Sequence, residues 1–471
     1  MAAHNNLPIR DEAFSGSDHA LARGVVRPVA TFLGRETAAG ILLIIATAAA
    51  LIWANVDYET YSDFWHTEIA LEIGDFRLYE DLSHWVNDAL MALFFFVVGM
   101  EIKSELVLGD LRNPKIAALP AIGALGGMVV PAAFYFVFNT SGAAADGWGI
   151  PMATDIAFAV GVLALVGHKV PKQLPLFLLT LAIVDDIGAI VVIAVFYNDG
   201  GLSFGWLGWA VAGLLAVVVM QRIRIWFTPL YVVIGCFVWF ATFESGVHAT
   251  IAGVALGMLT PAKPLIGDQA LGHLFSSEHF ETEGFGPRIA RDAQFQIRER
   301  VGVTTRLIAL LSPFTSYVII PVFALANAGI LLSTDVITDA LASSVTIGII
   351  FGLVVGKPLG IYVFSVFAIR SGLATLPRSL KQVHILAAGA VAGIGFTVAL
   401  FINGLAFEDE ALIKDQATIG VLLASLLATL LGYGIIRFSH VSDDATPEGD
   451  RMAEMVDTDG DGRPDPVPVG S

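Results

Sequence analysis

Four ionisable side chains lie within long apolar stretches of the sequence, where a charged group is energetically unfavourable and is kept only for a structural or functional role. Asp155 lies in GIPMATDIAFAVGVLALV, and the pair Asp185 and Asp186 lies in the middle of LPLFLLTLAIVDDIGAIVVIAVFY. Lys357 lies in VTIGIIFGLVVGKPLGIYVFSVFAI. On membrane-insertion scales, a charge at such a position costs about 2.5–3.5 kcal/mol. Four such groups on three stretches favour a functional site over salt bridges that only join helices.

The types of these residues indicate the chemistry of the site. Carboxylate oxygens, with the hydroxyl group of Thr154 beside Asp155, suit a small hard cation. Because burial disfavours the charged form of a carboxylate, the same oxygens could hold either a proton or Na⁺ near neutral pH. Competition of two ions for one site is what exchange requires. Lys357 would supply a counter-charge, and a buried lysine can itself release a proton.

Asp185 and Asp186 cannot both face one partner squarely, because adjacent residues on a helix point about 100° apart. We expect one of them to face the ion and the other to face Lys357, and the spacing alone does not say which. Since these residues come from separate stretches of the chain, the helices that carry them must pack together.

The composition indicates a membrane protein. Of the 471 residues, 56% are hydrophobic and 15% are charged, and the mean hydropathy is +0.74. Soluble domains have about 45–50% apolar and about 25% charged residues, so this composition excludes a disordered chain, a coiled coil and an ordinary cytosolic enzyme. The net charge of −17 argues against a nucleic-acid binder. A single cysteine, Cys236, excludes internal disulfides and a cysteine-based zinc site.

Twelve apolar runs are long enough for membrane-spanning helices, since a span needs about 20 mostly apolar residues. The sequence therefore predicts an all-α integral membrane protein with twelve spans. The runs lie near 36–55, 83–105, 116–138, 149–167, 173–197, 204–221, 226–243, 246–262, 307–332, 344–369, 382–406 and 411–436.

The basic residues predict the orientation of these spans. With the N-terminus inside, the outward segments carry only Arg77 and Lys414, Lys357 lies within a span, and the other 23 of the 26 basic residues fall on the inner side. We therefore expect both termini in the cytoplasm. The expected parts are a cytoplasmic N-terminal segment 1–35, a twelve-span domain 36–437 with an outer loop 56–82 and a long cytoplasmic loop 263–306, and an acidic tail 438–471.

The outer loop 56–82 contains EIALEIGDFRLYE, which alternates around Gly74-Asp75 and predicts a β-hairpin over 68–80. A lone hairpin is marginally stable in water. We expect this hairpin either to pair with its copy in a homodimer or to lie on its own loops.

The acidic tail ends in VDTDGDGRPDPVPVGS, in which Asp457, Asp459 and Asp461 match the start of a calcium-binding loop. Pro468 stands where such a loop needs a bidentate Glu. A disordered acidic tail is therefore favoured over a calcium site.

Helix-breaking residues interrupt two of the twelve runs. The fourth run contains Pro151 before Thr154 and Asp155, and the eleventh contains Gly389, Gly393 and Gly395 in AGAVAGIGFTVALF. Interrupted spans at matching positions of two halves point to the ion site of a transporter, and spans 3–5 and 10–12 would form an inverted repeat. Close helix packing by small residues is the alternative interpretation.

Three titratable residues lie near the ends of spans: His248 could respond to pH, and Glu101 and Glu105 belong to a charged cytoplasmic cluster. Glu101 and Glu105 lie within about one turn at the inner end of the second span, and His248 lies near the start of the 246–262 run. The alternatives are snorkelling carboxylates at a helix end and a hydrogen-bonded interfacial histidine.

Five motifs together resemble those of the NhaA-type sodium/proton antiporters. They are ATDIAFAVGVLALVG, LAIVDDIGAIVVIAVFY, SGVHATIAGV, GKPLGI and AGIGFT, within a match from about Trp85 to Arg437 in the family's order. The resemblance implies a twelve-span protein of the bacterial inner membrane. It also implies an inverted repeat, two discontinuous helices that cross at mid-depth, and a dimer formed through an outer hairpin.

The resemblance also assigns roles to site residues. It implies that Asp186 binds Na⁺ or Li⁺ and protons, and that Asp185 pairs with Lys357. It implies that Thr154 and Asp155 lie at the helix crossing, near the opposed helix ends.

The regulatory region departs from the family. Ser104 stands where the family typically has Arg in its E-x-K-R-E-L motif, and Ile308, Ala309 and Ser312 replace an acidic residue and two histidines. The family's pH set point therefore does not carry over to this chain, although Glu101, Glu105 and His248 match their family positions.

The sequence thus predicts an electrogenic secondary antiporter that exports Na⁺ and Li⁺ in exchange for protons, with two protons per Na⁺ as the resemblance implies. A K⁺/H⁺ or less selective monovalent cation/proton antiporter is the alternative. We expect no enzymatic activity, because the G-x-G-D motif of an intramembrane aspartyl protease is absent, the aspartates are doubled, and such a protease would not need the lysine. We also expect no cofactor. A channel is disfavoured, because it would need a ring of like charges or a carbonyl filter, and twelve spans in a single chain with a buried lysine fit this poorly. The expected partners are the transported ions, membrane lipid and a second copy of the chain.

Overall fold

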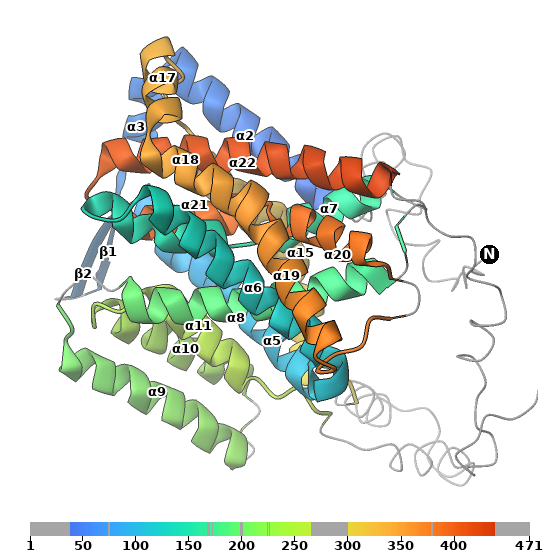
Figure 1. Cartoon of the computed structure of the whole chain (residues 1–471). Coiled ribbons are helices and arrows are strands. Elements are labelled where there is room, and N and C mark those ends of the chain that lie inside the picture. The colour runs from blue at the N-terminus through green and yellow to red at the C-terminus, as the bar shows by residue number, and fades with distance from the viewer. Residues whose placement is uncertain are drawn as a thin grey trace, which may run out of the picture.

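The chain folds mostly into helices, with one small β-hairpin (Figure 1). The computed structural model describes residues 38–73, 76–166, 170–171, 173–197, 201–223, 225, 227–264, 300–377 and 380–438. The predicted N-terminal segment 1–35, the Gly74-Asp75 turn, positions 265–299 of the long loop, and the tail from 439 with its calcium-loop-like sequence lie outside the described residues.

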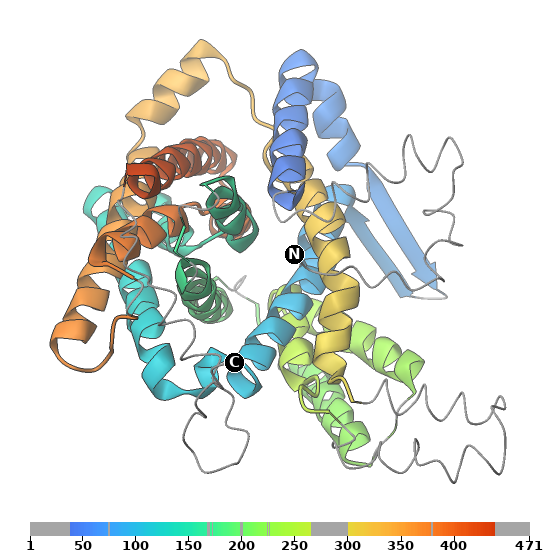
Figure 2. The same ribbon diagram turned by 90° about the vertical axis from the view of Figure 1, so that its right-hand side faces the viewer.

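The helices form two groups that lie side by side (Figure 2). The first group consists of α2 (Ala38–Val56), α3 (Tyr58–Trp65), α4 (Leu82–His84), η3 (Trp85–Leu90), α5 (Met91–Val107), α9 (Phe204–Arg222), α10 (Thr228–Phe243), α11 (Ala249–Leu259), α15 (Val303–Phe314), η8 (Thr315–Ile319) and α16 (Ile320–Asn327). A short 3₁₀ turn, η4 (Asp110–Arg112), leads from α5 into the second group.

The second helix group contains the segments that carry Asp155, Asp185, Asp186 and Lys357. It consists of α6 (Pro114–Phe138), η5 (Ala143–Met152), α7 (Ile156–Val166), α8 (Gln173–Phe196), α17 (Thr334–Ala342), α18 (Ser344–Phe351), η9 (Gly352–Gly356), α19 (Lys357–Arg370), α20 (Gln382–Ala392), α21 (Phe396–Ala406) and α22 (Ala411–Phe438).

Each of the twelve apolar runs contains helical structure at its predicted place. In the described part of the chain, seven helices are individually long and apolar enough to cross a membrane, and two bent helix pairs raise this number to nine. Two further apolar helices, α10 and α11, are shorter. Twelve crossings and an inverted repeat therefore stay predictions.

Three spans contain a π-helical turn that the sequence analysis did not predict: η3, η8 and η9. Both η8 and η9 end two residues before a proline, Pro321 and Pro358 respectively. A proline lacks an N–H group and clashes with the carbonyl four residues earlier, so the extra residue of a π turn accommodates its ring. Because η9 ends at Gly356, it sets the direction of Lys357, the first residue of α19.

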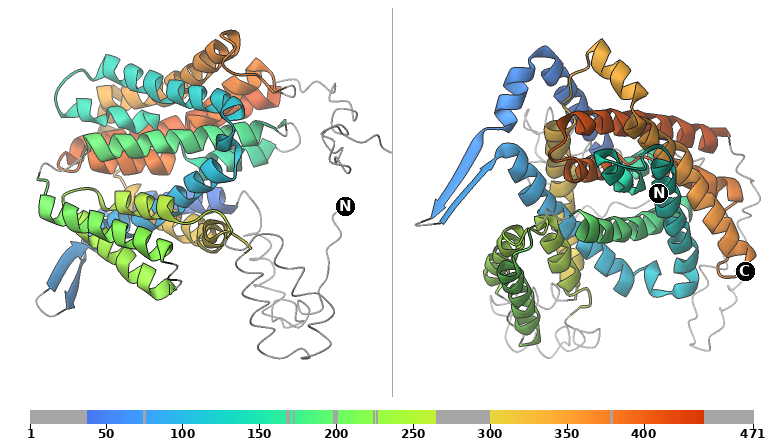
Figure 3. Two further views of the ribbon diagram at one scale, coloured as in Figure 1. Left: turned by 90° about the horizontal axis from the view of Figure 1, so that it is seen from below. Right: turned by 60° about the vertical axis from the view of Figure 1, so that its left-hand side comes forward.

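The predicted hairpin is confirmed. Strands β1 (Glu68–Ile73) and β2 (Phe76–Asp81) are antiparallel, with Glu68 opposite Asp81 and Ile73 opposite Phe76. The hairpin projects from the side of the helix bundle (Figure 3). Its pairing with a second copy of the chain stays a prediction.

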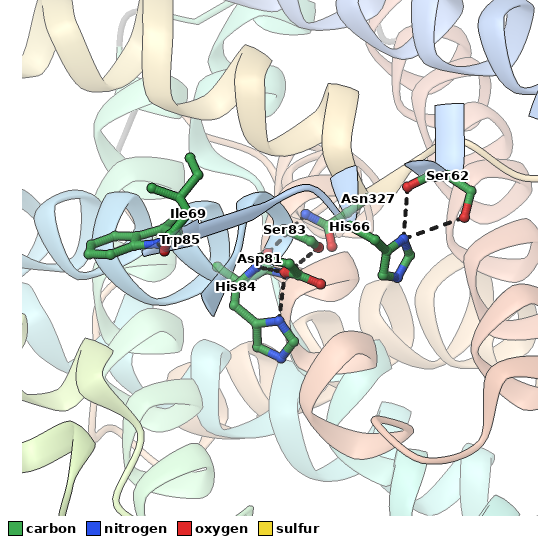
Figure 4. A network of polar contacts seen from close by, with 9 residues as sticks. Ser62, His66, Ile69, Asp81, Ser83, His84, Trp85 and Asn327 are labelled. Atoms are coloured by element: carbon green, nitrogen blue, oxygen red, sulfur yellow. Dashed lines mark hydrogen bonds and ion pairs between the residues drawn. The ribbon is translucent and has the colours of Figure 1, made fainter. Parts of the chain in front are cut away.

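Polar contacts form a network at the base of the hairpin (Figure 4). One carboxylate oxygen of Asp81 accepts the backbone N–H of His84 and also lies 2.7 Å from His84 Nδ1. Nearby, Asn327 Nδ2 donates to Asn87 Oδ1 at 2.9 Å and joins the end of α16 to η3. The chain is thus held by hydrogen bonds where β2 passes into the first helix group.

Helices α6 and α19 approach one another through glycines. A Cβ atom on Gly126 would collide with the carbonyl oxygen of Gly360, and a Cβ atom on Gly360 would collide with the carbonyl oxygen of Gly126. A Cβ atom on Gly127 would lie 3.9 Å from Lys357 Cε. This close backbone contact therefore fixes the position of Lys357 beside α6.

We expect Gly360→Ala to lower the free energy of unfolding by about 1–3 kcal/mol, because an added methyl group overpacks the contact with Gly126. Thermal unfolding in detergent measures the change. The matched control is Gly161→Ala in α7, where the new methyl group meets nothing within 4 Å and alanine favours the helix. Equal melting temperatures for Gly360→Ala and Gly161→Ala would contradict the tight contact.

Candidate functional site

Two helices of the second group are broken near their centres. The segment η5 ends at Met152 and α7 begins at Ile156 with a bend of 44°, while α20 ends at Ala392 and α21 begins at Phe396 with a bend of 48°. The two breaks lie against one another, since the backbone N–H of Asp155 donates to the carbonyl of Ile394 at 2.7 Å. The predicted interruption of both spans is therefore confirmed.

Small residues at the second break also permit close packing. A Cβ atom on Gly395 would lie 3.2 Å from the carbonyl oxygen of Ala153, and one on Gly393 would collide with the carbonyl oxygen of Leu353. Interruption and close packing, which the sequence analysis treated as alternatives, both apply at this position.

The carboxylate of Asp155 caps the N-termini of two half-helices. Its Oδ1 accepts the N–H of Phe158 at 2.9 Å, within α7. Its Oδ2 accepts the N–H of Thr397 at 3.2 Å and the hydroxyl of Thr397 at 2.6 Å, at the start of α21. The N-terminal ends of helices carry partial positive charge, so a buried carboxylate stabilises both. A role of Asp155 in binding the ion stays a prediction.

Lys357 and Thr154 lie at the C-terminal ends of the other two half-helices, η5 and α20. Lys357 Nζ donates to the carbonyl of Met152, the last residue of η5. Thr154 Oγ1 lies 2.9 Å from the carbonyl oxygen of Ala392, the last residue of α20. Carbonyl ends carry partial negative charge, so the ammonium group of Lys357 is stabilised beside the end of η5.

The predicted ion pair between Asp185 and Lys357 is present. Lys357 Nζ lies 2.6 Å from Asp185 Oδ2, and the side chains are 0% and 1% exposed. Thr154 Oγ1 lies 2.7 Å from the same Asp185 oxygen. One oxygen of Asp185 therefore meets two donors in a dry environment.

The other carboxylate oxygens of α8 have no such partners. Asp185 Oδ1 is buried without a hydrogen bond, and in the described part of the chain no hydrogen bond is found for the side chain of Asp186, which is 8% exposed. If Asp155, Asp185, Asp186 and Lys357 were all ionised, this buried cluster would carry a net charge of −2. A cation or protons must offset such a charge in a medium of low dielectric constant.

The three predicted regulatory residues are not brought together. Glu105 accepts the backbone N–H of Asp110 at 2.9 Å, just after the C-terminal end of α5. Glu101 lies on α5 and faces Ser312 on α15. His248 precedes α11 and lines a cavity together with Asn87 and Asp88 of η3.

A cavity of about 450 Å³ opens between the two helix groups near the base of the hairpin. His248, Asp88 and Asn327 line it from the first group, and Phe401 and Glu408 line it from the second. Among the described residues, no group of three or more His, Cys, Asp or Glu side chains is arranged to hold a metal ion. The candidate site is therefore the carboxylate pair of α8 with its neighbours.

Sequence reasoning missed two residues that hold the broken helices. Thr397 belongs to the AGIGFT motif, and its position after the break could have suggested a cap for α21. Ser425 on α22 accepts the backbone N–H of Phe396 at 3.3 Å. No local signal marked Ser425, because its contact with Phe396 depends on how α22 packs against the break.

We expect Lys357→Ala to lower the free energy of unfolding by about 3–5 kcal/mol, because it leaves the Asp185 carboxylate buried without its partner. The double variant Lys357→Ala with Asp185→Asn should recover part of this loss. Thermal unfolding of the wild type, both single variants and the double variant gives the coupling between the residues. A double variant as unstable as the sum of the single variants would show that Asp185 and Lys357 do not interact.

One family and several known proteins are similar to this chain over most of its length. The sequence model of the family described as Na⁺/H⁺ antiporter 1 matches residues 30–436. The Na⁺/H⁺ antiporter NhaA 3 of Frankia alni is 45% identical over 416 residues, covering 88% of this chain and 89% of that protein. The Na⁺/H⁺ antiporter NhaA of Rhodopirellula baltica is 45% identical over 419 residues, covering 87% and 94% respectively. The Na⁺/H⁺ antiporter NhaA 2 of Sorangium cellulosum is 43% identical over 432 residues, covering 88% and 92%.

Proposed function

Because the chain belongs to the Na⁺/H⁺ antiporter family and has several helices able to span a membrane, it is a multi-pass membrane protein, and we propose that it exports Na⁺ in exchange for protons. The observation that carries this proposal is the set of carboxylate oxygens on α8 that have no hydrogen-bond donor. Asp185 Oδ1 and the carboxylate of Asp186 lie in a buried cluster that would carry a net negative charge with every group ionised. Such oxygens suit Na⁺ and protons in turn.

The exchange follows from competition for these oxygens. Asp186 holds a proton or Na⁺, and Thr154 can contribute its hydroxyl oxygen to the ion. The pair of Asp185 and Lys357 supplies the second proton. Two protons then move inward for each Na⁺ that moves outward, so one net charge crosses the membrane and the membrane potential assists export. Li⁺ would use the same oxygens, and the process would serve sodium and pH homeostasis.

Alternating access would come from motion of the second helix group against the first. The carboxylate pair and Lys357 belong to the second group, so they would move together as one unit. The cavity near His248 lies between the two groups, on the side of the hairpin. Rocking of one bundle around a fixed midplane site is a general mechanism of transporters with broken helices.

The wider topology is part of this proposal. The positions of the basic residues support twelve spans with cytoplasmic termini. We also propose an inverted repeat of spans 3–5 and 10–12 and a location in the bacterial inner membrane. We also propose that the protein is a transporter without enzymatic activity or a cofactor, and that Glu101, Glu105 and His248 adjust its response to pH.

Asp186→Asn tests the assignment of the ion site, because it keeps the size of the side chain and removes its charge. We expect Na⁺- and Li⁺-induced proton movement in inverted membrane vesicles to fall to background while the protein still inserts. The matched control is Asp339→Asn, the same change at an exposed position in α17. Retention of near wild-type exchange by Asp186→Asn would remove Asp186 from the mechanism.

The same vesicles decide between the two candidate substrates. Na⁺, Li⁺ or K⁺ is added in turn across a range of pH, and the proton movement that follows each addition identifies the exchanged cation. Proton movement with K⁺ equal to that with Na⁺ would favour the alternative of a K⁺/H⁺ or less selective exchanger.

Removal of the hairpin tests the proposed homodimer. We expect deletion of residues 68–80 to convert a dimer into a monomer in detergent, with exchange retained at reduced stability, because the ion site lies in the second helix group. Light scattering coupled to size-exclusion chromatography measures the mass of the protein. A deletion variant that remains dimeric would locate the contact between copies in the helices.

A further inference from the structure

The segment η5 forms a 3₁₀ helix of ten residues, from Ala143 to Met152. Because the hydrogen bonds of a 3₁₀ helix have poor geometry, runs longer than about four residues are uncommon. Pro151 lies within this segment and has no backbone N–H group to donate. The conformation of η5 therefore depends on contacts with other segments. This matters for the site because the carbonyl of Met152 accepts a hydrogen bond from Lys357.

Tyr197 connects η5 to the C-terminal end of α8. It directly follows α8, and its backbone N–H donates to the carbonyl of Ile193 at 3.2 Å, so it continues the helix. Its hydroxyl group donates to the carbonyl of Asp146 at 2.6 Å and accepts the N–H of Gly149 at 3.1 Å. Tyr197 is 7% exposed, so its hydroxyl group serves the backbone of η5 in a largely dry environment.

The surface of η5 is shaped to receive Tyr197. A Cβ atom on Gly149 would collide with the hydroxyl oxygen of Tyr197. The ring of Trp148 on η5 stacks on the ring of Tyr197, with centroids 6.5 Å apart. Tyr135 of α6 donates to the carbonyl of Ala144 at 2.6 Å and so holds the start of η5. Tyr197 is therefore the tyrosine that holds the later part of this segment.

Lys357 joins the same two segments at another point. Its Nζ lies 2.6 Å from Asp185 Oδ2 on α8, and it donates to the carbonyl of Met152 on η5. The segments α8 and η5 are therefore connected twice, once by Tyr197 and once by Lys357. Met152 follows Gly149 by about one turn of 3₁₀ helix, so a shift of Gly149 moves the Met152 carbonyl relative to Asp185.

We propose that Tyr197 is a positioning residue of the ion site, which holds the carbonyl of Met152 where Lys357 can contact both this carbonyl and Asp185. Without the Tyr197 hydroxyl group, η5 separates from α8 and Lys357 loses one of its two partners. Thr154 lies two residues after Met152, so its hydroxyl oxygen moves with the same segment. The inference rests on the proposed function, because it assigns the geometry of the proposed Na⁺ site to a residue outside that site.

Tyr197→Phe tests this role, because it removes the hydroxyl group and keeps the ring against Trp148. In inverted membrane vesicles we expect the KM for Na⁺ to rise about fivefold, the factor that one hydrogen bond of typical strength provides, with the maximal rate kept. The matched control is Tyr61→Phe in the first helix group, where the hydroxyl oxygen lies 2.9 Å and 2.8 Å from the carbonyl oxygens of Leu325 and Ala326.

Tyr61→Phe should lower the melting temperature without a change in the KM for Na⁺, because it lies outside the second helix group. A Tyr197→Phe protein with a lowered melting temperature and the wild-type KM would show that Tyr197 only supports the fold, and would overturn the proposal. An equal rise of the KM in both variants would also overturn it, because the effect would then follow any loss of a tyrosine hydroxyl group.

A double-mutant cycle of Tyr197→Phe with Lys357→Ala tests the same link without transport. Tyr197 lies about 18 Å along α8 from Asp185, and sites so far apart normally contribute additively to the free energy of unfolding. We expect the double variant to lose less than the sum of the single variants, because each change alone already breaks the connection between α8 and η5. An additive cycle would overturn the proposal.

If the variants with Lys357→Ala do not fold, the comparison of the KM values of Tyr197→Phe and Tyr61→Phe decides alone. The two proposals fail in different measurements. Absence of Na⁺-driven proton movement in the wild type would reject the proposed function, and the cycle of unfolding free energies would still decide whether Tyr197 positions the partners of Lys357.

Discussion

The constraint on which the site depends is the hydrogen bonding of backbone groups exposed by two broken helices in an apolar interior. An unsatisfied backbone group in such surroundings costs several kcal/mol. The protein meets this requirement with side chains from other segments: Asp155 caps two N-termini, Lys357 meets one carbonyl end and Thr154 meets the other. Ser425 binds a further free N–H group. The charged residues that are energetically unfavourable in apolar segments therefore also satisfy the backbone groups that the broken helices expose.

The carboxylate oxygens of this cluster fall into two groups: those that accept hydrogen bonds from the helix-holding donors and those that have no donor. Both oxygens of Asp155 and one oxygen of Asp185 are occupied by donors that hold the helices. The second oxygen of Asp185 is buried without a donor. The oxygens that hold the helix ends and those that we propose to bind an ion thus lie within one buried cluster.

The sequence could predict the features that arise from local composition. Apolar length predicted where helices lie, Pro151 and Gly393 predicted where two of them break, and the alternation around Gly74-Asp75 predicted the hairpin. The pairing of Asp185 with Lys357 came from the family resemblance, since spacing alone left either aspartate open. The acceptor role of the Met152 carbonyl and the contact of Ser425 with Phe396 could not be predicted, because they depend on the packing of distant spans. The π turns were missed because the prolines that accompany η8 and η9 also occur in ordinary helices.

The π turn η9 has a consequence for the freedom of Lys357. A π turn contains one residue more than an α-helical turn, so α18 to α19 holds a spare residue within a continuous span. If this spare residue migrates along the helix, the residues that it passes rotate about the helix axis while both ends of the span stay where they are. Lys357 directly follows the π turn. Such a migration would turn the ammonium group of Lys357 relative to α8 through local exchange of backbone hydrogen bonds, without sliding the helix through the membrane.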